Sequence, residues 1–403
     1  MNYEHTASKL NEECGMKKLG PVLLRGSWQT KNIGDIAHTP GFLSLARKYL
    51  PEMPVYLWPC AIDRGVREML LANFPGLRIV ETEAEIEAAF RECSLLIHGS
   101  CPMIDLDGVD RWRRSTGKPY GCFGISADGL WSRRKQEICS DAAFIFCRDS
   151  LSEHFLRAQN LSCPVLGFTP DATFHIRLNS DSEAAAGFLS ENGLERGRFV
   201  CVIPRLRWTP SSFDDAKFYY KDAGRERVSL ACLEPDLEKL RETIAGILET
   251  TDLKVLICPE MTYQVPLGRR LFEMLPEKLR ARTVLKRDYW ITDEAMGVYA
   301  AAHSLISMEM HSPILFIAAG LPAILLRQAE DTWKGQMWRD LGMQNWILEL
   351  NQTPAEMILD RFRSIAADWN GAKKAAETAR ETADRIGAEN VKRIGQLLRK
   401  WMA

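Results

Sequence analysis

A histidine and an acidic residue occur together where a strand of a parallel sheet is expected to end. Residues 307–313 read Ser-Met-Glu-Met-His-Ser-Pro and precede a short apolar run. This pattern predicts a strand that ends near Ser307 and a helix that starts near His311. The start of a helix favours a phosphate or carboxylate, and a histidine there can transfer a proton near neutral pH. The segment therefore predicts chemistry on an anionic substrate, with His311 and Glu309 as candidate catalytic residues and Ser307 as a substrate contact.

A glycine and an aspartate follow the first expected strand of the chain. Asn32, Gly34 and Asp35 lie before a helix that the cap residue Thr39 and the following Pro40 are expected to open. At Gly34 the backbone could approach a ligand closely, because glycine has no side chain. Asp35 could then orient substrate hydroxyl groups, or it could simply cap the helix. We take Asp35 as a candidate catalytic residue and Asn32 and Gly34 as candidate substrate contacts.

Positive side chains follow several of the expected strands. A guanidinium group binds phosphate or carboxylate through two parallel hydrogen bonds, which an ammonium group does less well. Arg205, which follows the expected strand 199–203, is therefore the favoured contact for an anionic donor. Arg148 could bind substrate or form a structural ion pair with Asp149 or Asp171, and such pairs contribute little when exposed. The expected cationic contacts are Arg148, Arg205, Arg327 and Lys334.

Length and charge limit the classes of protein to which the chain can belong. With 403 residues, the chain is long enough for two or three domains. Its 52 lysine and arginine residues nearly cancel its 53 aspartate and glutamate residues, so no overall field favours nucleic acid as a partner. The longest apolar run, residues 313–326, is interrupted by Gly320 and Pro322 and is too short to span a bilayer. We therefore expect no transmembrane segment.

The cysteine usage is typical of the cytoplasm. The eleven cysteines are odd in number, scattered, and contain no C-x-x-C pair. Such cysteines are usually reduced, buried thiols rather than disulfide partners or zinc ligands. We expect a cytoplasmic protein with neither a metal site nor a cofactor.

The hydrophobic pattern alternates between short apolar runs and amphipathic segments, which is typical of β-α-β units. One series of expected strands runs from residue 22 to residue 168, and a second begins at residue 199. We therefore predict an α/β protein with two Rossmann-like doubly wound domains and C-terminal helices. The predicted division is an N-terminal extension (1–19), a first domain (20–175), a linker and helix (176–198), a second domain (199–350) and the C-terminal helices (351–403).

Two segments keep alternative interpretations. The aromatic-rich segment 207–225 lacks periodicity and is either a functional lid or an ordered surface insertion. The last expected helix, about residues 372–401, packs across the crevice between the domains, forms a dimer contact or is a mobile tail.

Four short motifs together resemble those of the polysaccharide pyruvyl transferase family. The block that ends at His311 is similar to the family's S-x-R-x-H signature, including the nine-residue step from His311 to Gly320. Residues 32–35 resemble the family's N-x-G-D loop, residues 148–152 its R-D-x-x-S motif and residues 170–174 its P-D-x-x-F segment.

The resemblance implies two Rossmann-like domains in a glycosyltransferase-B-like arrangement, with the site in the crevice between them. It also implies transfer of a pyruvyl unit from phosphoenolpyruvate to two hydroxyls of a saccharide, as in exopolysaccharide biosynthesis, with Arg205 at the donor position. Protonation of the enol carbon would create a cationic centre that a sugar hydroxyl attacks, and phosphate would leave. His311 is then the expected acid or phosphate contact.

One position departs from the family signature. Glu309 stands where the family has arginine, and a carboxylate cannot replace a guanidinium as a phosphate ligand. Either the donor is not phosphoenolpyruvate, or other cations hold it, namely Arg205, Arg207, Arg327 or Lys334. Two alternative functions stay open. One is a nucleotide-sugar glycosyltransferase in which Glu309 binds a ribose hydroxyl, and the other is a non-catalytic protein that binds a sugar or an anion.

Overall fold

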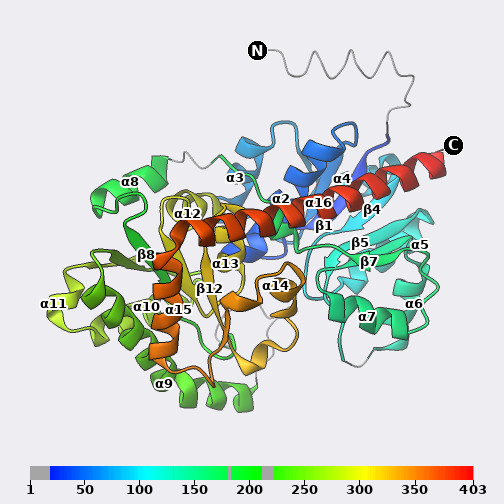
Figure 1. Ribbon diagram of the computed structural model, residues 1–403. Helices are drawn as coiled ribbons and strands as arrows, with labels where there is room; N and C mark the ends of the chain where they lie inside the picture. The colour runs from blue at the N-terminus through cyan, green and yellow to red at the C-terminus, as the bar shows by residue number, and fades with distance from the viewer. Residues whose placement is uncertain (1–18, 130, 180–182, 211–221, 403) are drawn as a thin grey trace.

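Two parallel β-sheets, each flanked by helices, form the molecule (Figure 1). The computed structural model describes residues 19–129, 131–179, 183–210 and 222–402. The first sheet has the strand order β3-β2-β1-β4-β5-β6-β7, and the second has the order β10-β9-β8-β11-β12-β13. The predicted α/β class with two doubly wound halves is confirmed. Residues 1–18 of the expected extension and residues 211–221 of the aromatic-rich segment lie outside the described residues.

The first sheet alternates short strands with helices. Its strands are β1 (Val22–Gly26), β2 (Val55–Pro59), β3 (Arg78–Ile79), β4 (Leu95–His98), β5 (Tyr120–Ile125), β6 (Phe144–Cys147) and β7 (Leu166–Phe168). The helices are α2 (Ile33–Tyr49), α3 (Val66–Asn73), α4 (Glu83–Glu92), α5 (Leu106–Thr116), α6 (Arg133–Asp141), α7 (Ser150–Ala158) and the 3-10 helix η1 (Ala172–His175). Val22 of β1 lies opposite Val55 of β2 and Leu95 of β4. Strand order reverses between β1 and β4, and sheets of this kind bind ligands at the carboxyl ends of such strands.

The second sheet repeats this plan. Its strands are β8 (Phe199–Ile203), β9 (Lys254–Ile257), β10 (Thr283–Leu285), β11 (Ser304–Ser307), β12 (Ala323–Arg327) and β13 (Ile347–Glu349). The helices are α8 (Glu183–Glu191), α9 (Ala223–Thr250), α10 (Gln264–Met274), α11 (Glu277–Arg280), α12 (Thr292–Tyr299), α13 (His311–Ala318), α14 (Gln336–Asp340) and the 3-10 helices η2 (Ala329–Asp331) and η3 (Gln344–Trp346). Strand order reverses between β8 and β11. The domain boundaries proposed from the sequence stay a prediction, although β7 and β8 fall on either side of the linker 176–198.

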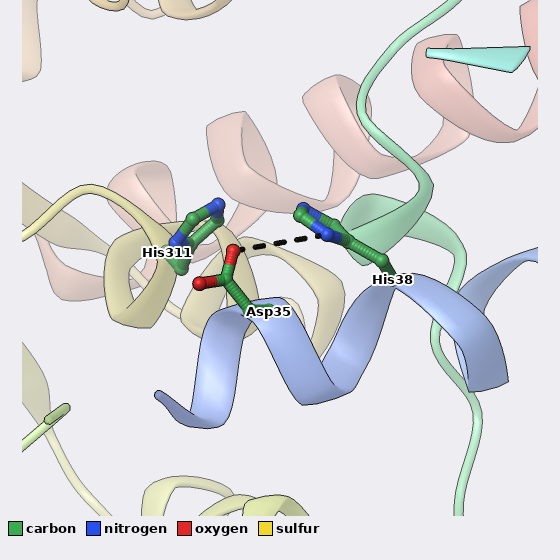
Figure 2. A group of neighbouring side chains, drawn as sticks. All are labelled: Asp35, His38 and His311. Atoms are coloured by element: carbon green, nitrogen blue, oxygen red, sulfur yellow. Dashed lines mark ion pairs between the residues drawn. The ribbon is translucent and has the colours of Figure 1, made fainter. Parts of the chain in front are cut away.

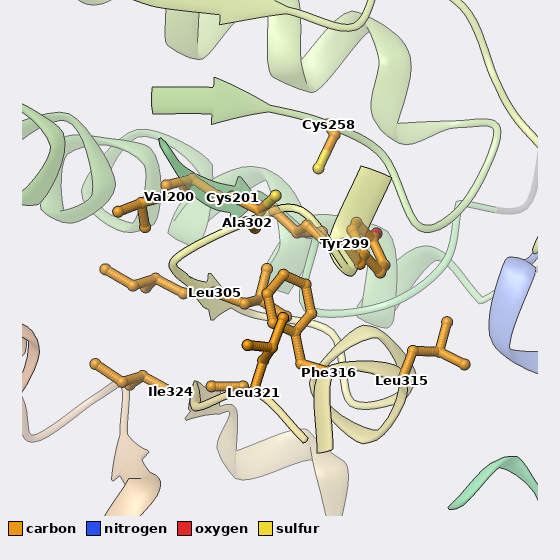
Figure 3. Packing of buried hydrophobic residues seen from close by; sticks show 14 of the residues in the cluster. Val200, Cys201, Cys258, Tyr299, Ala302, Leu305, Leu315, Phe316, Leu321 and Ile324 are labelled. Carbon is orange, nitrogen blue, oxygen red and sulfur yellow. The ribbon is translucent and has the colours of Figure 1, made fainter. Parts of the chain in front are cut away.

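The core of the second sheet fixes the helix that carries the candidate histidine. Every residue of β8 is buried, as expected for a central parallel strand covered on both faces. Val200 of β8 and Leu305 of β11 belong to one apolar cluster with Tyr299 and Phe316 (Figure 3). The rings of Tyr299 and Phe316 pack with their centroids 4.8 Å apart. Because each such side chain stabilises the fold by about 1.5–3 kcal/mol when buried, α13 is held firmly against the sheet.

The last helix runs across both halves of the molecule. α16 (Trp369–Met402) follows α15 (Ala355–Ala367) and extends over both sheets (Figure 1). Its early alanines belong to the core of the second sheet, and its later apolar residues belong to the core of the first. The two sets are Ala376, Ala379 and Ala383, and Val391, Ile394 and Leu398. Of the three interpretations of this helix, packing across both halves is confirmed. Among the described helices, none is long and apolar enough to span a membrane.

The first long helix begins earlier than predicted. α2 already includes Gly34 and Asp35, because the Asn32 side chain caps it by accepting hydrogen bonds from the backbone N–H of both residues, at 2.7 and 3.3 Å. Pro40, which was expected at the first helical position, lies inside the helix. The expected start at Thr39 is therefore wrong. Asp35 is a residue of the first turn rather than the cap.

Candidate functional site

A small pocket lies between the two halves, at the carboxyl ends of their strands. Its volume is about 170 Å³. One wall comes from the segments that follow β1, β4 and β6, and the other from the segments that follow β8, β9, β11 and β12. Its lining includes charged and other polar side chains, among them Asn32, Asp35, Arg148, Arg205, Glu309, His311, Asp331 and Lys334. Both points of strand reversal contribute to one site, as expected for open α/β sheets.

A buried carboxylate holds His311 in place. Glu260, which follows β9, places its Oε1 atom 3.4 Å from His311 Nδ1. Its Oε2 atom accepts a hydrogen bond from the backbone N–H of Ser312 at 2.6 Å. Burial alone lowers the pKa of His311, but Glu260, Asp35 and Asp171 outweigh burial and raise this pKa above its ordinary value. The arrangement therefore favours a protonated imidazole. His311 Nε2 is buried and has no hydrogen-bond partner among the described residues.

Gly34 and His311 meet where α2 approaches α13. A Cβ atom placed on Gly34 would lie 2.1 Å from His311 Cβ, a separation that real Cβ atoms essentially never show. The two helices come this close only because residue 34 has no side chain. The backbone N–H of Ile33 also donates to the carbonyl of Glu260 at 3.0 Å, which ties the same regions together. Gly34 thus makes room for the histidine, and it does not line the pocket.

Asp35 faces His311 from α2, and its carboxylate lies between the imidazoles of His311 and His38 (Figure 2). Asp35 Oδ1 is 3.9 Å from His38 Nδ1, and His38 Nε2 is 3.3 Å from Asp171 Oδ1. Asp171 is fully buried and accepts a hydrogen bond from Arg148 Nη1 at 2.9 Å. Burial opposes ionisation of Asp171, yet His38, Arg148 and His311 together hold its pKa well below the usual range. Arg148 therefore has a structural ion pair and also lines the pocket.

Among the described residues, the three side chains in Figure 2 form a group that could hold a metal ion. The ligand atoms of Asp35, His38 and His311 lie within 4.8 Å of one another. Ligands bound to one ion at about 2.1 Å stand only about 3.0–3.4 Å apart, so an ion would require this group to contract. The buried carboxylate of Glu260 behind His311 stabilises a proton on that imidazole without any movement. An ion bound here would compete with that proton for His311.

Glu309 pairs with Arg205 inside the pocket. Glu309 Oε1 lies 3.3 Å from Arg205 Nε and accepts a hydrogen bond from Gln264 Nε2 at 2.6 Å. Arg205 Nη1 also donates to Asp331 Oδ1 at 2.6 Å. Burial raises the pKa of Glu309 to about 7, because it outweighs the opposing effect of Arg205 and because Glu260 adds repulsion. Near neutral pH, Glu309 is divided between its charged and neutral forms, while Asp331 already balances the charge of Arg205.

Lys334 brings an ammonium group close to the two arginines of the pocket. Burial lowers the pKa of Lys334, and the positive charges of Arg205 and Arg148 lower it further, against the effect of Asp331. Such a cluster of cations is stabilised by an anion that binds among them. The pocket therefore offers a site for a phosphate or carboxylate even though Glu309 replaces the expected arginine.

Besides Gly34, two further residues predicted to contact substrate, Ser307 and Arg327, lie outside the pocket lining. Ser307 is buried, and its Oγ atom both accepts from Glu309 N at 2.9 Å and donates to Glu309 O at 2.8 Å. It fixes the turn that presents Glu309. Arg327 Nη1 donates to Glu349 Oε2 at 2.7 Å. Asn32 does line the pocket, and its side chain also caps α2.

Two supporting residues were not anticipated from the sequence. The sequence did not indicate His38 as a site residue, because the helix that contains it was expected to begin only after it. Asp331 follows β12 as Arg205 follows β8, and this position at a strand end could have indicated it. The R-D-x-x-S motif has a clear local role, since Asp149 caps α7 by accepting hydrogen bonds from the N–H and hydroxyl of Ser152, each at 2.7 Å.

Comparison with known families agrees with this geometry. The model of the family described as polysaccharide pyruvyl transferase matches residues 29–329. The chain belongs to the polysaccharide pyruvyl transferase family. The matched region includes both points of strand reversal and the segments that carry Asp35, Arg148, Arg205 and His311. A comparison of the sequence with curated proteins gives no match.

Solved structures of other proteins are similar to this chain in fold. A UDP-N-acetylglucosamine 2-epimerase from Neisseria meningitidis, bound to UDP-GlcNAc, is 10% identical with a TM-score of 0.59, over 94% of this chain and 99% of that chain. An ADP-heptose LPS heptosyltransferase II from E. coli is 10% identical with a TM-score of 0.53, over 87% and 99%. An Anabaena protein in complex with UDP and glucose is 9% identical with a TM-score of 0.55, over 94% and 100%. These likenesses show a glycosyltransferase-B-like fold.

Proposed function

We propose that this pyruvyl transferase family member transfers a pyruvyl group, as a ketal, from phosphoenolpyruvate or a related small anionic donor to a saccharide. One feature carries this proposal: His311, backed by Glu260, lines the same pocket as the cations Lys334 and Arg148. The pocket volume of about 170 Å³ supports a small donor, because drug-sized ligands occupy pockets of about 300–1,000 Å³. Family membership supports the transferase class.

The proposed donor contacts explain how the site tolerates Glu309. Lys334 and Arg148 bind the phosphate and carboxylate of the donor, in place of the missing arginine. Arg205 is shared between Asp331 and Glu309, so it is not available to the donor. Repulsion between Glu309 and the donor is smallest when Glu309 holds a proton, which its raised pKa allows near neutral pH.

The proposed reaction begins with proton transfer from His311 to the methylene carbon of the donor, which makes the neighbouring carbon electrophilic. A saccharide hydroxyl forms a C–O bond to that carbon and gives its proton to Asp35. The C–O bond to phosphate then breaks, and phosphate leaves with the bonding electrons. A second hydroxyl closes the ketal. Asp35 passes the first hydroxyl proton to the departing phosphate, and the proton of the second hydroxyl restores His311 through Asp35, which faces it.

The test is direct binding of phosphoenolpyruvate, measured by titration calorimetry. The native protein should bind it, and Lys334→Met should weaken binding by about tenfold or more, since a charge-assisted contact is lost. Lys278→Met is the matched control, because Lys278 lies on α11 with its side chain 73% exposed. Binding of UDP-N-acetylglucosamine in place of phosphoenolpyruvate would instead establish a nucleotide-sugar enzyme. Saturable binding of phosphoenolpyruvate without phosphate release in the presence of any saccharide would indicate a non-catalytic binding protein.

A further inference from the structure

A second and larger cavity opens beside the small pocket. Its volume is about 690 Å³, within the range of about 300–1,000 Å³ that is usual for ligand sites. Trp28, Cys101 and Met103 line both cavities, so the two are neighbouring compartments of one crevice. The lining of the larger cavity comes from the first half of the molecule, at the carboxyl ends of β1, β2 and β4 and along α5 and α6.

An arginine between two indoles forms one wall of this cavity. The Arg25 guanidinium carbon lies 4.4 Å from the ring centroid of Trp58 and 5.8 Å from that of Trp28. Arg25 Nε donates to Asp105 Oδ2 at 2.7 Å, and Arg25 Nη1 donates to the carbonyl of Pro59 at 3.0 Å. The wall therefore combines apolar ring surface with polar donors and acceptors. Sugar rings present the matching combination of C–H faces and hydroxyl groups.

This wall is fixed before any ligand binds. Trp28 stacks on His98 with the ring centroids 4.6 Å apart, and its indole N–H donates to the carbonyl of Ser100 at 2.7 Å. His98 Nε2 in turn accepts a hydrogen bond from Asp105 N at 2.9 Å. Ligands bind more tightly to side chains that need no ordering, because less conformational entropy is lost. These contacts preorganise the cavity.

The charges that line the larger cavity are balanced locally. Arg25 pairs with Asp105, and Arg134 donates to Asp107 at 2.7 Å. Arg111 is paired with Glu83 on the neighbouring helix α4. A ligand therefore meets paired charges here rather than a field of one sign. Balanced pairs offer hydrogen bonds to hydroxyl groups without selecting for a charge.

We propose that the larger cavity is the acceptor subsite and binds a neutral mono- or disaccharide, with its terminal residue directed past Trp28 toward Asp35. This inference rests on the proposed function, because it places the saccharide that receives the pyruvyl group. Trp28 and Asp35 both line the small pocket, so a sugar seated against Trp28 presents its hydroxyls to the donor compartment.

The test is a titration of the full-length protein with the neutral disaccharides lactose, cellobiose and maltose, followed by saturation-transfer NMR. Arg25→Met should weaken disaccharide binding by about tenfold or more, because it removes the guanidinium group that lies between the two indoles. Arg134→Ala tests the rim of the cavity and is matched by Arg133→Ala. Arg133 is its neighbour in sequence, with its side chain 93% exposed and paired with Glu137. Thermal unfolding of each variant shows whether the fold is retained.

The subsite is supported if a neutral disaccharide binds saturably and inorganic phosphate does not displace it. Arg25→Met or Arg134→Ala should then weaken this binding, and Arg133→Ala should leave it unchanged. The subsite is overturned if no neutral disaccharide binds, or if folded Arg25→Met and Arg134→Ala variants both bind as the native protein does. If an aldobiouronic acid binds tenfold more tightly than the neutral disaccharides, the proposal that the ligand is neutral is overturned. If UDP displaces the sugar, the cavity is a nucleotide site instead. Phosphoenolpyruvate binding, measured on the same samples, separates this inference from the proposed function, since either can fail while the other result stands.

Discussion

Replacing Glu309 with glutamine should strengthen donor binding above neutral pH and leave it nearly unchanged in mild acid. Glu309 lies in the pocket, and its pKa is raised to about 7, chiefly by burial. A donor anion repels the ionised carboxylate, so the pocket binds the donor better when Glu309 is neutral. Donor binding therefore takes up a proton on Glu309, and the affinity of the native protein should fall as pH rises through 7.

The size of the effect follows from the cost of protonation. At pH 8, one unit above the pKa, keeping Glu309 neutral costs about 1.4 kcal/mol, which is about tenfold in Kd. Leaving it charged beside the donor would cost more, about 4 kcal/mol for two unit charges at about 4 Å and an effective dielectric constant of about 20. Protonation of Glu309 costs less free energy than charge repulsion, so the cost of protonation sets the size of the effect on Kd. Glu309→Gln should therefore bind phosphoenolpyruvate about tenfold more tightly than the native protein at pH 8, and equally well at pH 6.

The assay is calorimetric titration of phosphoenolpyruvate at pH 6, 7 and 8 and constant ionic strength, in buffers of different ionisation enthalpy that report proton uptake. The donor phosphate and His311 titrate in both proteins, so the ratio of the two affinities isolates Glu309. Weaker binding by Glu309→Gln at pH 8 would refute the reasoning and make Glu309 a donor contact. Glu309→Arg should also strengthen binding, and its gain should shrink with added salt.

Three further predictions concern the parts that hold the site together. His311→Ala should lower transfer by roughly a hundredfold or more, and unchanged turnover in a folded variant would remove His311 from the mechanism. Gly34→Ala should destabilise the fold by about 1–3 kcal/mol in denaturant unfolding, because its Cβ would overlap His311, whereas Gly187→Ala on α8 meets no atom within 4 Å and should not. Burial, the dominant cause, lowers the pKa of His98 from 6.5 to about 4, so stability present above pH 6.5 should fall by about 3 kcal/mol as pH drops to 4. His98→Gln should flatten that acid-induced loss in thermal unfolding, and an unchanged slope would contradict the assignment.

The sequence was sufficient for the two series of alternating strands and helices, and it predicted the edge of each sheet at which the candidate residues lie. Asp35, Arg148, Arg205 and His311 each follow a strand of a doubly wound sheet, and parallel strands bring their carboxyl ends to one edge. The start of α2 was misjudged because the signal from Pro40, at the expected first helical position, competes with the cap at Asn32, and side-chain capping won.

The partners of these residues could not be predicted in the same way. Arg205 meets Glu309 and Asp331 through loops that follow three different strands, and local periodicity carries no information on such contacts. The burial of Glu260 against His311 likewise depends on how tightly α13 packs beside the loop after β9. The sequence therefore indicated which residues reach the crevice, whereas their pairing, and with it their charge, came from tertiary packing.

The course of α16 has a consequence for how the chain is synthesised. The first sheet is complete once residue 168 has been made, yet its apolar core also contains Val391, Ile394 and Leu398. On the ribosome, the first half must therefore wait, with part of its core uncovered, until almost the whole second half has emerged. A fragment that stops before residue 369 should accordingly require a chaperone or aggregate, and the two halves should not be separable by expression of either sheet alone.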